Sequence, residues 1–199
     1  MASAIQFIPS AVSAQLYQFG FLDSNTREHG NRVARYSVAI GKHMGLGAED
    51  LDGLQTAALW HDIGKIAIEA RILEKPGRLT QDEFELIKRH PVKGASMLQS
   101  FSRHVLAGIE LHHERLDGSG YPYGLAGDRI PMTARIIAVA DTYDAITSHR
   151  PYQTAMSRAF AVERIRSLAA SKLDPRVVAA LEMVIELGQL FTEQDKAPN

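Results

Sequence analysis

The sequence contains no cysteine among its 199 residues. This absence excludes a disulfide scaffold, a thiolate metal site and a cysteine nucleophile. Net charge is also nearly absent, because 22 lysines and arginines stand against 23 aspartates and glutamates. A broad basic surface is therefore not expected, and polymeric nucleic acid is not an expected partner.

Long apolar runs are absent too. No segment approaches the roughly 18 to 20 apolar residues that a transmembrane helix requires, so we expect no insertion into a membrane. The first charged side chain belongs to Asp23, and the first cation is Arg27. Because a secretory signal begins with a positively charged region, residues 1–22 do not qualify as one, and we expect a cytoplasmic protein.

Residues 1–25 form a separate N-terminal segment, for which two interpretations stay open. Val12, Leu16 and Phe19 recur at helical spacing and predict a helix over residues 10–19. This helix either covers part of the core, or it connects to an upstream sensory domain or joins two copies as a homodimer through residues 1–22. Light scattering of the chain with and without these residues distinguishes the two interpretations.

The rest of the sequence lacks the alternation of apolar and polar residues that strands require, and it predicts helices nearly throughout. Thr80 and Glu83 have the spacing of a capping box. Asp174 followed by Pro175 is typical of an N-cap and the first helical position. We therefore predict a single all-α domain over residues 26–187, followed by a polar tail over residues 188–199. The predicted helices cover about residues 26–43, 48–60, 80–89, 104–114, 131–147 and 174–187, with two more beginning near residues 91 and 157.

Eight histidines stand out in this otherwise ordinary composition. Any one of them alone is more often a surface or hydrogen-bonded residue than a metal ligand. His61 and Asp62 are adjacent, and adjacent residues on a helix diverge by about 100°, so the pair suits two neighbouring metal ions better than one. The two oxygens of Asp62 make it the natural bridge between two cations. Imidazoles and carboxylates without sulfur favour iron, manganese, nickel or zinc over calcium.

Several sequence blocks follow one another in the order typical of one known family. They are His29-x-x-Arg32-Val33, His61-Asp62-Ile63-Gly64-Lys65, Leu73-x-Lys75-Pro76-Gly77-x-Leu79-Thr80, His90-Pro91-x-x-Gly94, His112-His113-Glu114, Asp117-Gly118-x-Gly120-Tyr121-Pro122, Asp141-x-x-Asp144-Ala145 and Arg150-Pro151-Tyr152. On these motifs the chain resembles the HD-GYP family, a branch of the HD phosphohydrolases that act on cyclic dinucleotides. The resemblance spans about residues 26–187 and implies an HD-type helical bundle with a long GYP loop and a metal centre in the bundle core.

The resemblance implies a centre of two divalent metal ions, iron or manganese. The first ion is expected on His29, His61, Asp62 and Asp141, and the second on His90, His112 and His113, with Asp62 as the bridge. Some family members hold a third metal with the help of a glutamate one helical turn before the first histidine. Asn25 stands at that position, and an amide is a neutral and weaker ligand, so two metals are expected.

The resemblance also implies hydrolysis of the 3′–5′ phosphodiester bonds of cyclic di-GMP, first to linear pGpG and then to GMP. We expect in-line attack by a metal-bridging hydroxide, with Asp62 and Lys65 as the catalytic residues. Lys65 follows His61 by four residues, so both side chains face the same cleft if the helix continues that far. Its ammonium would then stabilise the charge that builds on the phosphate oxygens.

Substrate contacts are expected from Lys65, Gly120, Tyr121, Pro122, Asp144 and Arg150. Glycines let the loop backbone approach a bulky ligand, and Tyr121 offers a ring face for guanine. A tight structural loop is an equally good interpretation of this segment. Asp144 could instead orient a metal ligand or Arg150. Gln153 replaces a basic residue that the family often carries, which weakens the expected contacts to the second nucleotide.

Two other functions stay open. One is hydrolysis of another cyclic dinucleotide, such as cyclic GMP-AMP, or of another phosphorylated nucleotide. The other is a catalytically silent module that binds cyclic di-GMP or contacts other signalling proteins through the GYP loop. Every expected metal ligand is present in the sequence, which favours an enzyme over a silent module. The three remaining histidines, His43, His104 and His149, match no metal position of the family.

Overall fold

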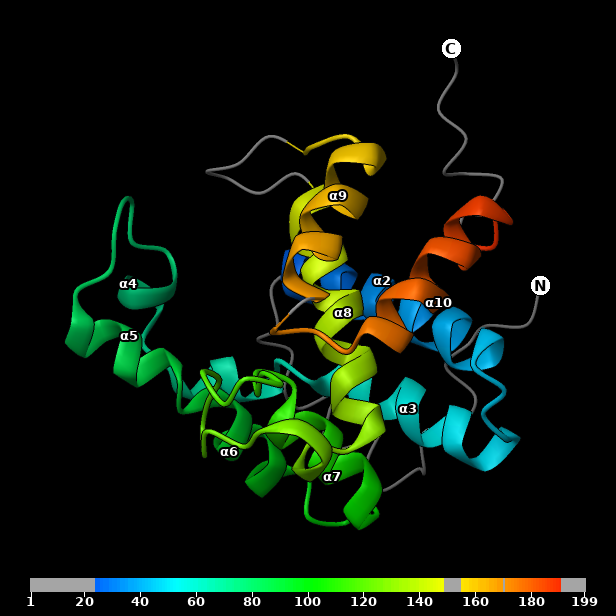
Figure 1. The fold of residues 1–199 in the computed structure, drawn as a ribbon. Coiled ribbons are helices and arrows are strands. Elements are labelled where there is room, and N and C mark those ends of the chain that lie inside the picture. Colours follow the sequence, from blue (N-terminus) through cyan, green and yellow to red (C-terminus); the bar gives the residue numbers. More distant parts are fainter. Residues whose placement is uncertain (1–23, 149–154, 170, 191–199) are drawn as a thin grey trace.

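The computed structural model describes residues 24–148, 155–169 and 171–190. These residues form helices and loops without a strand, which confirms the predicted all-α class (Figure 1). The predicted helix over residues 10–19 lies outside the described residues, as do Arg150 and Gln153. The helices are α2 (Ser24–His43), α3 (Ala48–Trp60), α4 (Ala70–Leu73), α5 (Gln81–Ile87), α6 (His90–Met97), α7 (Arg103–Leu111), α8 (Met132–Thr147), α9 (Arg158–Ala169) and α10 (Pro175–Glu186), with 3₁₀ helices η1 (Ile63–Ala67) and η2 (Gly127–Arg129).

Helix α8 runs through the middle of the bundle and packs against α2, α3, α7, α9 and α10 (Figure 1). Its sequence is apolar on most faces, as expected for a helix surrounded by others. Ile136, Ile137, Val139 and Tyr143 are all buried in the main core. Because α2 packs on both α3 and α8, functional side chains carried by these three helices are held close together.

Helix α3 ends at Trp60, as predicted, and the chain then turns through η1. This segment packs directly on α6, and Gly64 is the point of closest approach. A Cβ at Gly64 would overlap the carbonyl oxygen of His90 and would lie 2.6 Å from the backbone nitrogen of Gly94. The absence of a side chain at Gly64 therefore lets His61 and Asp62 lie beside the start of α6.

Helices α4 and α5 project from the side of the bundle (Figure 1). The capping box that begins α5 is confirmed, since Thr80 Oγ1 accepts from the backbone of Glu83 and the Glu83 carboxylate accepts from the backbone of Thr80. The helix ends at Ile87, two residues before the predicted end, and none of its residues is buried. No helix of the described ranges is both long and apolar enough to cross a membrane.

The predicted N-cap of α10 is also confirmed, and it belongs to a buried ion-pair cluster. Asp174 accepts from the backbone nitrogen of Arg176 at 2.9 Å and from Arg135 Nη1 at 2.9 Å. Burial, the largest influence, raises the pKa of Asp174, but the hydrogen bonds from Arg176 and Arg135 outweigh it and lower the pKa from 3.8 to about 2. This carboxylate therefore links α8 to α10.

We expect Asp174→Asn to lower the free energy of unfolding at pH 7 by about 2 kcal/mol, the value of a shift of this size. A carboxylate whose pKa is depressed on folding stabilises above its unfolded pKa, so this contribution disappears as the pH falls from about 4 to about 2. Urea unfolding at several pH values measures the difference. The matched control is Asp128→Asn, which removes a fully exposed carboxylate from the same arginine; an equal effect in both variants would contradict the prediction.

Candidate metal centre

The seven side chains expected to hold metal all lie together inside the bundle. Asp62, His90, His112 and His113 form one group, and His29, His61 and Asp141 form the other, with the potential ligand atoms of each group within 4.8 Å of one another. The side chains come from α2, the end of α3, the start of α6, the end of α7 and the middle of α8. Five segments far apart in the sequence thus meet at one place.

Three of these histidines are fixed in the same way, each by a backbone carbonyl of the preceding helix end. The Nδ1 atoms of His61, His90 and His112 lie 2.7–2.8 Å from the carbonyl oxygens of the residues three positions earlier. A carbonyl can only accept, so each Nδ1 carries the hydrogen, and in the neutral ring the lone pair is then on Nε2. The three lone pairs face the interior of the cluster, which is the arrangement that a histidine-bound metal requires.

The cluster also holds buried polar atoms that lack a hydrogen-bond partner. In the described part of the chain four such side-chain atoms occur, and three of them are Asp62 Oδ1, His90 Nε2 and His112 Nε2. Buried polar atoms are nearly always satisfied, so three unpaired atoms within one ligand group call for a cation. Together with the donor set of imidazoles and carboxylates, this observation indicates divalent-metal binding.

His29 lies within ion-pair distance of two carboxylates, those of Asp62 and Asp141. His29 Nε2 lies 3.5 Å from Asp62 Oδ2 and 3.4 Å from Asp141 Oδ1. Burial lowers the pKa of His29, but hydrogen bonds to Asp141, Asp144 and Asp62 outweigh burial and raise it to about 11. Burial raises the pKa of Asp62, but Lys65 and the histidines hold it well below its usual value. Burial also raises the pKa of Asp141, but His29 and other histidines hold it well below its usual value, so both Asp62 and Asp141 stay ionised and attract positive charge.

The other side of the centre consists of neutral imidazoles. Burial, the largest influence, lowers the pKa of His112 far below 6.5, and the neighbouring histidines lower it further. Burial likewise lowers the pKa of His113 to about 3. Both rings are therefore unprotonated at neutral pH, in the form that can ligate a metal.

Lys65 lies on η1 and not on a continuation of α3. Its Nζ donates to Asp62 Oδ2 at 2.6 Å, and about a third of its side chain is exposed. The expected helical relation to His61 is thus replaced by a 3₁₀ turn, which directs the ammonium at Asp62. The structure therefore places a cation at the edge of the cluster, where solvent and ligands can reach it.

The model of the family described as HD domain matches residues 19–177, which is most of the chain. The chain belongs to the HD domain family. Its motifs and its relatives place it in the HD-GYP branch, in agreement with the resemblance of the sequence.

Three curated relatives illustrate the likeness of this HD-GYP domain to other proteins. The cyclic di-GMP phosphodiesterase response regulator RpfG of Xanthomonas campestris is 41% identical over 81% of this chain and 44% of the relative. A cyclic di-GMP phosphodiesterase of Thermotoga maritima is 43% identical over 87% of this chain and 49% of the relative. The 3′3′-cGAMP-specific phosphodiesterase 1 of Vibrio cholerae is 40% identical over 76% and 36%, respectively. The chain thus spans about half or less of the length of these relatives.

Solved structures agree with the HD-type helical fold. A protein from Bdellovibrio bacteriovorus, described as a HDG"Y"P protein, aligns with a TM-score of 0.67 at 21% identity, over 87% of this chain and 57% of that chain. A cyclic GMP-AMP specific phosphodiesterase of V. cholerae aligns with the same TM-score at 23% identity, over 84% and 47%. Because both identities are below 25%, these two similarities show a shared fold and nothing more.

Asp144 of the HD-GYP domain is fully buried and supports a metal-site histidine. Its Oδ2 accepts from His29 Nδ1 at 2.7 Å, and its Oδ1 accepts from Arg32 Nε at 2.6 Å. This arrangement fixes the ring of His29, with Nε2 directed at the cluster. It favours the positioning role over a direct substrate contact, because the carboxylate is already engaged. Arg32 had no predicted role, although it follows His29 by three residues and so lies on the same helical face.

The GYP loop, residues 117–127, is anchored by Glu114, another residue without a predicted role. Its two carboxylate oxygens accept from the backbone nitrogens of Tyr123 and Leu125 at 2.8 and 2.9 Å. Gly120 passes so close to the end of α7 that a Cβ there would lie 2.5 Å from the carbonyl oxygen of His113. The loop is therefore held against the helix end that carries the histidine pair, and the ring of Tyr121 lies 4.6 Å from that of His113.

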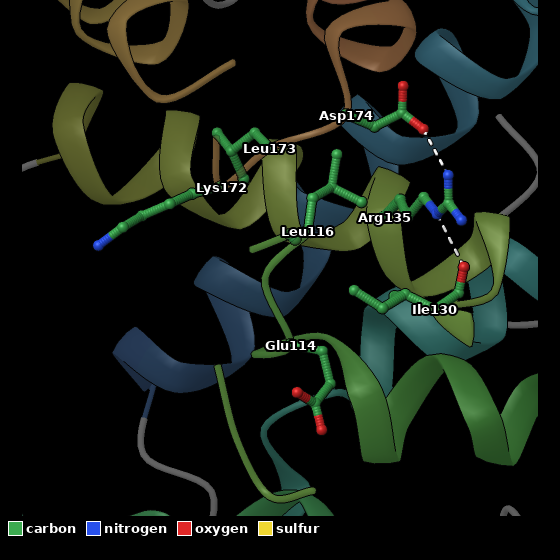
Figure 2. A pocket seen from close by; sticks show the side chains of 8 residues that line it. Glu114, Leu116, Ile130, Arg135, Lys172, Leu173 and Asp174 are labelled. Atoms are coloured by element: carbon green, nitrogen blue, oxygen red, sulfur yellow. Dashed lines mark hydrogen bonds and ion pairs between the residues drawn. The ribbon is translucent and has the colours of Figure 1, made fainter. Parts of the chain in front are cut away.

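A small cavity lies behind this loop (Figure 2). Its volume is about 10 Å³, which is room for one water molecule at most, so it is no substrate pocket. Arg135 lines it and donates to the carbonyl oxygen of Ile130 at 2.7 Å as well as to Asp174 (Figure 2). The cavity thus marks where the base of the loop is joined to α8 and α10.

Proposed function

We propose that this HD-GYP domain hydrolyses the 3′–5′ phosphodiester bonds of cyclic di-GMP to pGpG or GMP. The observation that carries the proposal is the pair of ligand groups that meet at Asp62 around unpaired buried acceptors. Relatives with 41–43% identity are named as cyclic di-GMP phosphodiesterases, which supports this choice of substrate. A cytoplasmic location is the expectation that accompanies such a substrate.

His29, His61 and Asp141 would hold one metal ion, and His90, His112 and His113 the other, with Asp62 between them. When bound, two divalent cations supply a water of lowered pKa and neutralise charge on the phosphate. Iron or manganese suits these nitrogen and oxygen donors. Asn25 is exposed on the first turn of α2 and offers only an amide, so we propose two ions and not three.

The other residues would bind and orient the dinucleotide. Lys65 would donate to a non-bridging phosphate oxygen from the edge of the cluster, where its ammonium is already held by Asp62. Gly120, Tyr121 and Pro122 would shape the wall beside His113. Arg150 would contact a phosphate or a guanine with its planar guanidinium.

We expect Lys65→Ala to lower kcat for cyclic di-GMP by about 10²-fold, as is typical when one donor to a developing oxyanion is removed. Lys65→Arg should recover part of this loss, because it keeps a cation at the same place. Steady-state kinetics measure the effect, and metal analysis should show an unchanged metal content. A kcat within twofold of the parent would contradict the role of Lys65.

Product chromatography tests the proposed activity itself. The protein is purified anaerobically, loaded with Mn²⁺ or Fe²⁺ and incubated with cyclic di-GMP and, separately, with 3′3′-cyclic GMP-AMP. We expect pGpG or GMP from cyclic di-GMP and two metal ions per chain by elemental analysis. Failure of protein with two bound ions to cleave either dinucleotide would refute the proposed function.

A second candidate is hydrolysis of cyclic GMP-AMP. The observation in its favour is the 40% identity to a relative named as a cGAMP-specific phosphodiesterase. Faster cleavage of cyclic GMP-AMP in the same experiment would select it. Binding of cyclic di-GMP without cleavage would instead select the silent module, whose protein partners would contact the GYP loop. Dimerisation through residues 1–22 is a separate proposal for light scattering.

A further inference from the structure

Helix α5 has no buried residue, although it carries several apolar side chains. Phe84 is 40% exposed, so packing within the protein does not explain its position. The helix is nevertheless held firmly. The capping box fixes its start, and the carbonyl oxygen of Ile87, its last residue, holds the Nδ1 atom of His90. A helix tied directly to a metal-site histidine thus presents a partly exposed aromatic ring.

Three rings form a row that leads outward from the metal centre. His113 belongs to the second ligand group, and its ring lies 4.6 Å from that of Tyr121 at an interplanar angle of 31°. The ring of Tyr121 then meets that of Phe84 edge to face, at 6.4 Å. Because His113 already covers one face of Tyr121, the more open ring surface at this site belongs to Phe84.

A cation completes the group. Lys88 Nζ lies 5.1 Å from the ring centre of Phe84 and 6.0 Å from that of Tyr121, within the range of cation–π contacts. It also pairs with the exposed carboxylate of Glu85 at 2.7 Å. The ammonium thus lies over the Phe84 ring, close enough to donate to the edge of a base that stacks on the remaining ring surface. Guanine presents two acceptors, O6 and N7, whereas adenine presents one acceptor and one donor.

We propose that Phe84, Tyr121 and Lys88 form a subsite that holds one guanine of the cyclic dinucleotide while its phosphate lies at the metal centre. This inference rests on the proposed function and specifies where that site takes the base. The exposed ring of Phe84 supplies the stacking surface, Tyr121 connects it to the ligand His113, and Lys88 donates to the acceptor edge of guanine. Base stacking on aromatic side chains is strong enough to contribute measurably to nucleotide affinity.

The first test compares KM values of Mn²⁺-loaded variants for cyclic di-GMP. We expect Phe84→Ala to raise KM by about tenfold, with the loss in KM and not in kcat, because stacking binds ground state and transition state alike. Phe84→Leu keeps apolar bulk without a ring and should resemble Phe84→Ala, whereas Phe84→Tyr should restore the parent KM. Phe160→Ala, which removes another exposed phenylalanine from α9, is the matched control.

The second test concerns Lys88 and the identity of the base. We expect Lys88→Met to lower the ratio of kcat/KM for cyclic di-GMP to kcat/KM for cyclic di-AMP by about fivefold, since the donor to guanine is lost. Lys42→Met, at an exposed position at the end of α2, is the matched control and should leave the preference unchanged. An unchanged preference in Lys88→Met would remove Lys88 from the subsite.

A binding readout separates failure of the subsite from failure of the proposed activity. The chain has a single tryptophan, so Phe84→Trp places a second fluorophore at the subsite, and a stacked guanine should quench it. Quenching by cyclic di-GMP without turnover would refute the proposed activity and support the subsite. Turnover by the parent together with an unchanged KM in Phe84→Ala and no quenching in Phe84→Trp would refute the subsite alone.

Discussion

Asp62→Asn is expected to abolish hydrolysis of cyclic di-GMP, with a loss of at least about 10³-fold in kcat. The stabilisation that metal ions give a phosphoryl transition state is worth several kcal/mol, and each 1.4 kcal/mol is a factor of ten. Asp62 is the side chain on which this depends, since its oxygens lie 3.5 Å from His29 Nε2 and 3.2 Å from His90 Nε2, one in each ligand group. An amide presents one oxygen without charge and two hydrogens, so it cannot join two cations.

Product chromatography and elemental analysis measure this result on the same preparation. The variant should remain folded in thermal melts while its metal content falls below two ions per chain. Asp50→Asn removes an exposed carboxylate from the first turn of α3, the helix that leads to Asp62, and is the matched control. Turnover and metal content equal to the parent in Asp62→Asn would disprove the bridging role.

Gly64→Ala is expected to have the largest effect on the folded protein. The added Cβ would overlap the carbonyl oxygen of His90 and press on the nitrogen of Gly94, and both are backbone atoms that cannot rotate away. Overpacking of this kind costs typically 1–3 kcal/mol, and we expect about 3 kcal/mol because η1 and α6 must separate. Since His90 opens α6, the separation also removes a ligand from the second metal group.

Urea unfolding of the metal-free protein and Mn²⁺ titration measure the two consequences of Gly64→Ala separately. Gly47→Ala is the matched control, because Gly47 has an ordinary backbone conformation and no atom within 4 Å of an added Cβ. Because Gly47 is the N-cap of α3, where glycine is better than alanine, this control should itself cost about 1 kcal/mol, well below the loss expected for Gly64→Ala. Parent-like stability and metal binding in Gly64→Ala would show that the backbone contact is not required.

Helix positions could be predicted where the chain carries local signals. The capping box at Thr80 and the N-cap at Asp174 act within one helical turn, so their sequence pattern is sufficient. The end of α7 was predicted at residue 114 but occurs at Leu111. Glu114 instead serves the loop with both carboxylate oxygens, a tertiary interaction that no local pattern encodes. The domain limits at residues 26 and 187 stay a prediction.

The metal cluster could be anticipated because its motifs occur in a family order, although the spacing of the residues alone did not show that they meet. The structure supplies what brings them together: packing of α2 on α3 and α8, and the close approach at Gly64. Supporting partners such as Arg32 escaped assignment for the same reason. Their roles depend on which residue of another helix they face, as Arg32 faces Asp144.

The backbone carbonyls that hold His61, His90 and His112 have a consequence for metal acquisition. The ring orientations are set by backbone carbonyls that are in place without any ion, so folding and metal binding are separable, unlike in zinc fingers, which unfold when the ion is removed. Chelation should therefore leave an assembled apoprotein that can be reloaded. A site that is filled after folding accepts the ion that its surroundings supply, and the metal found in it will follow the relative abundance of iron and manganese where the protein matures.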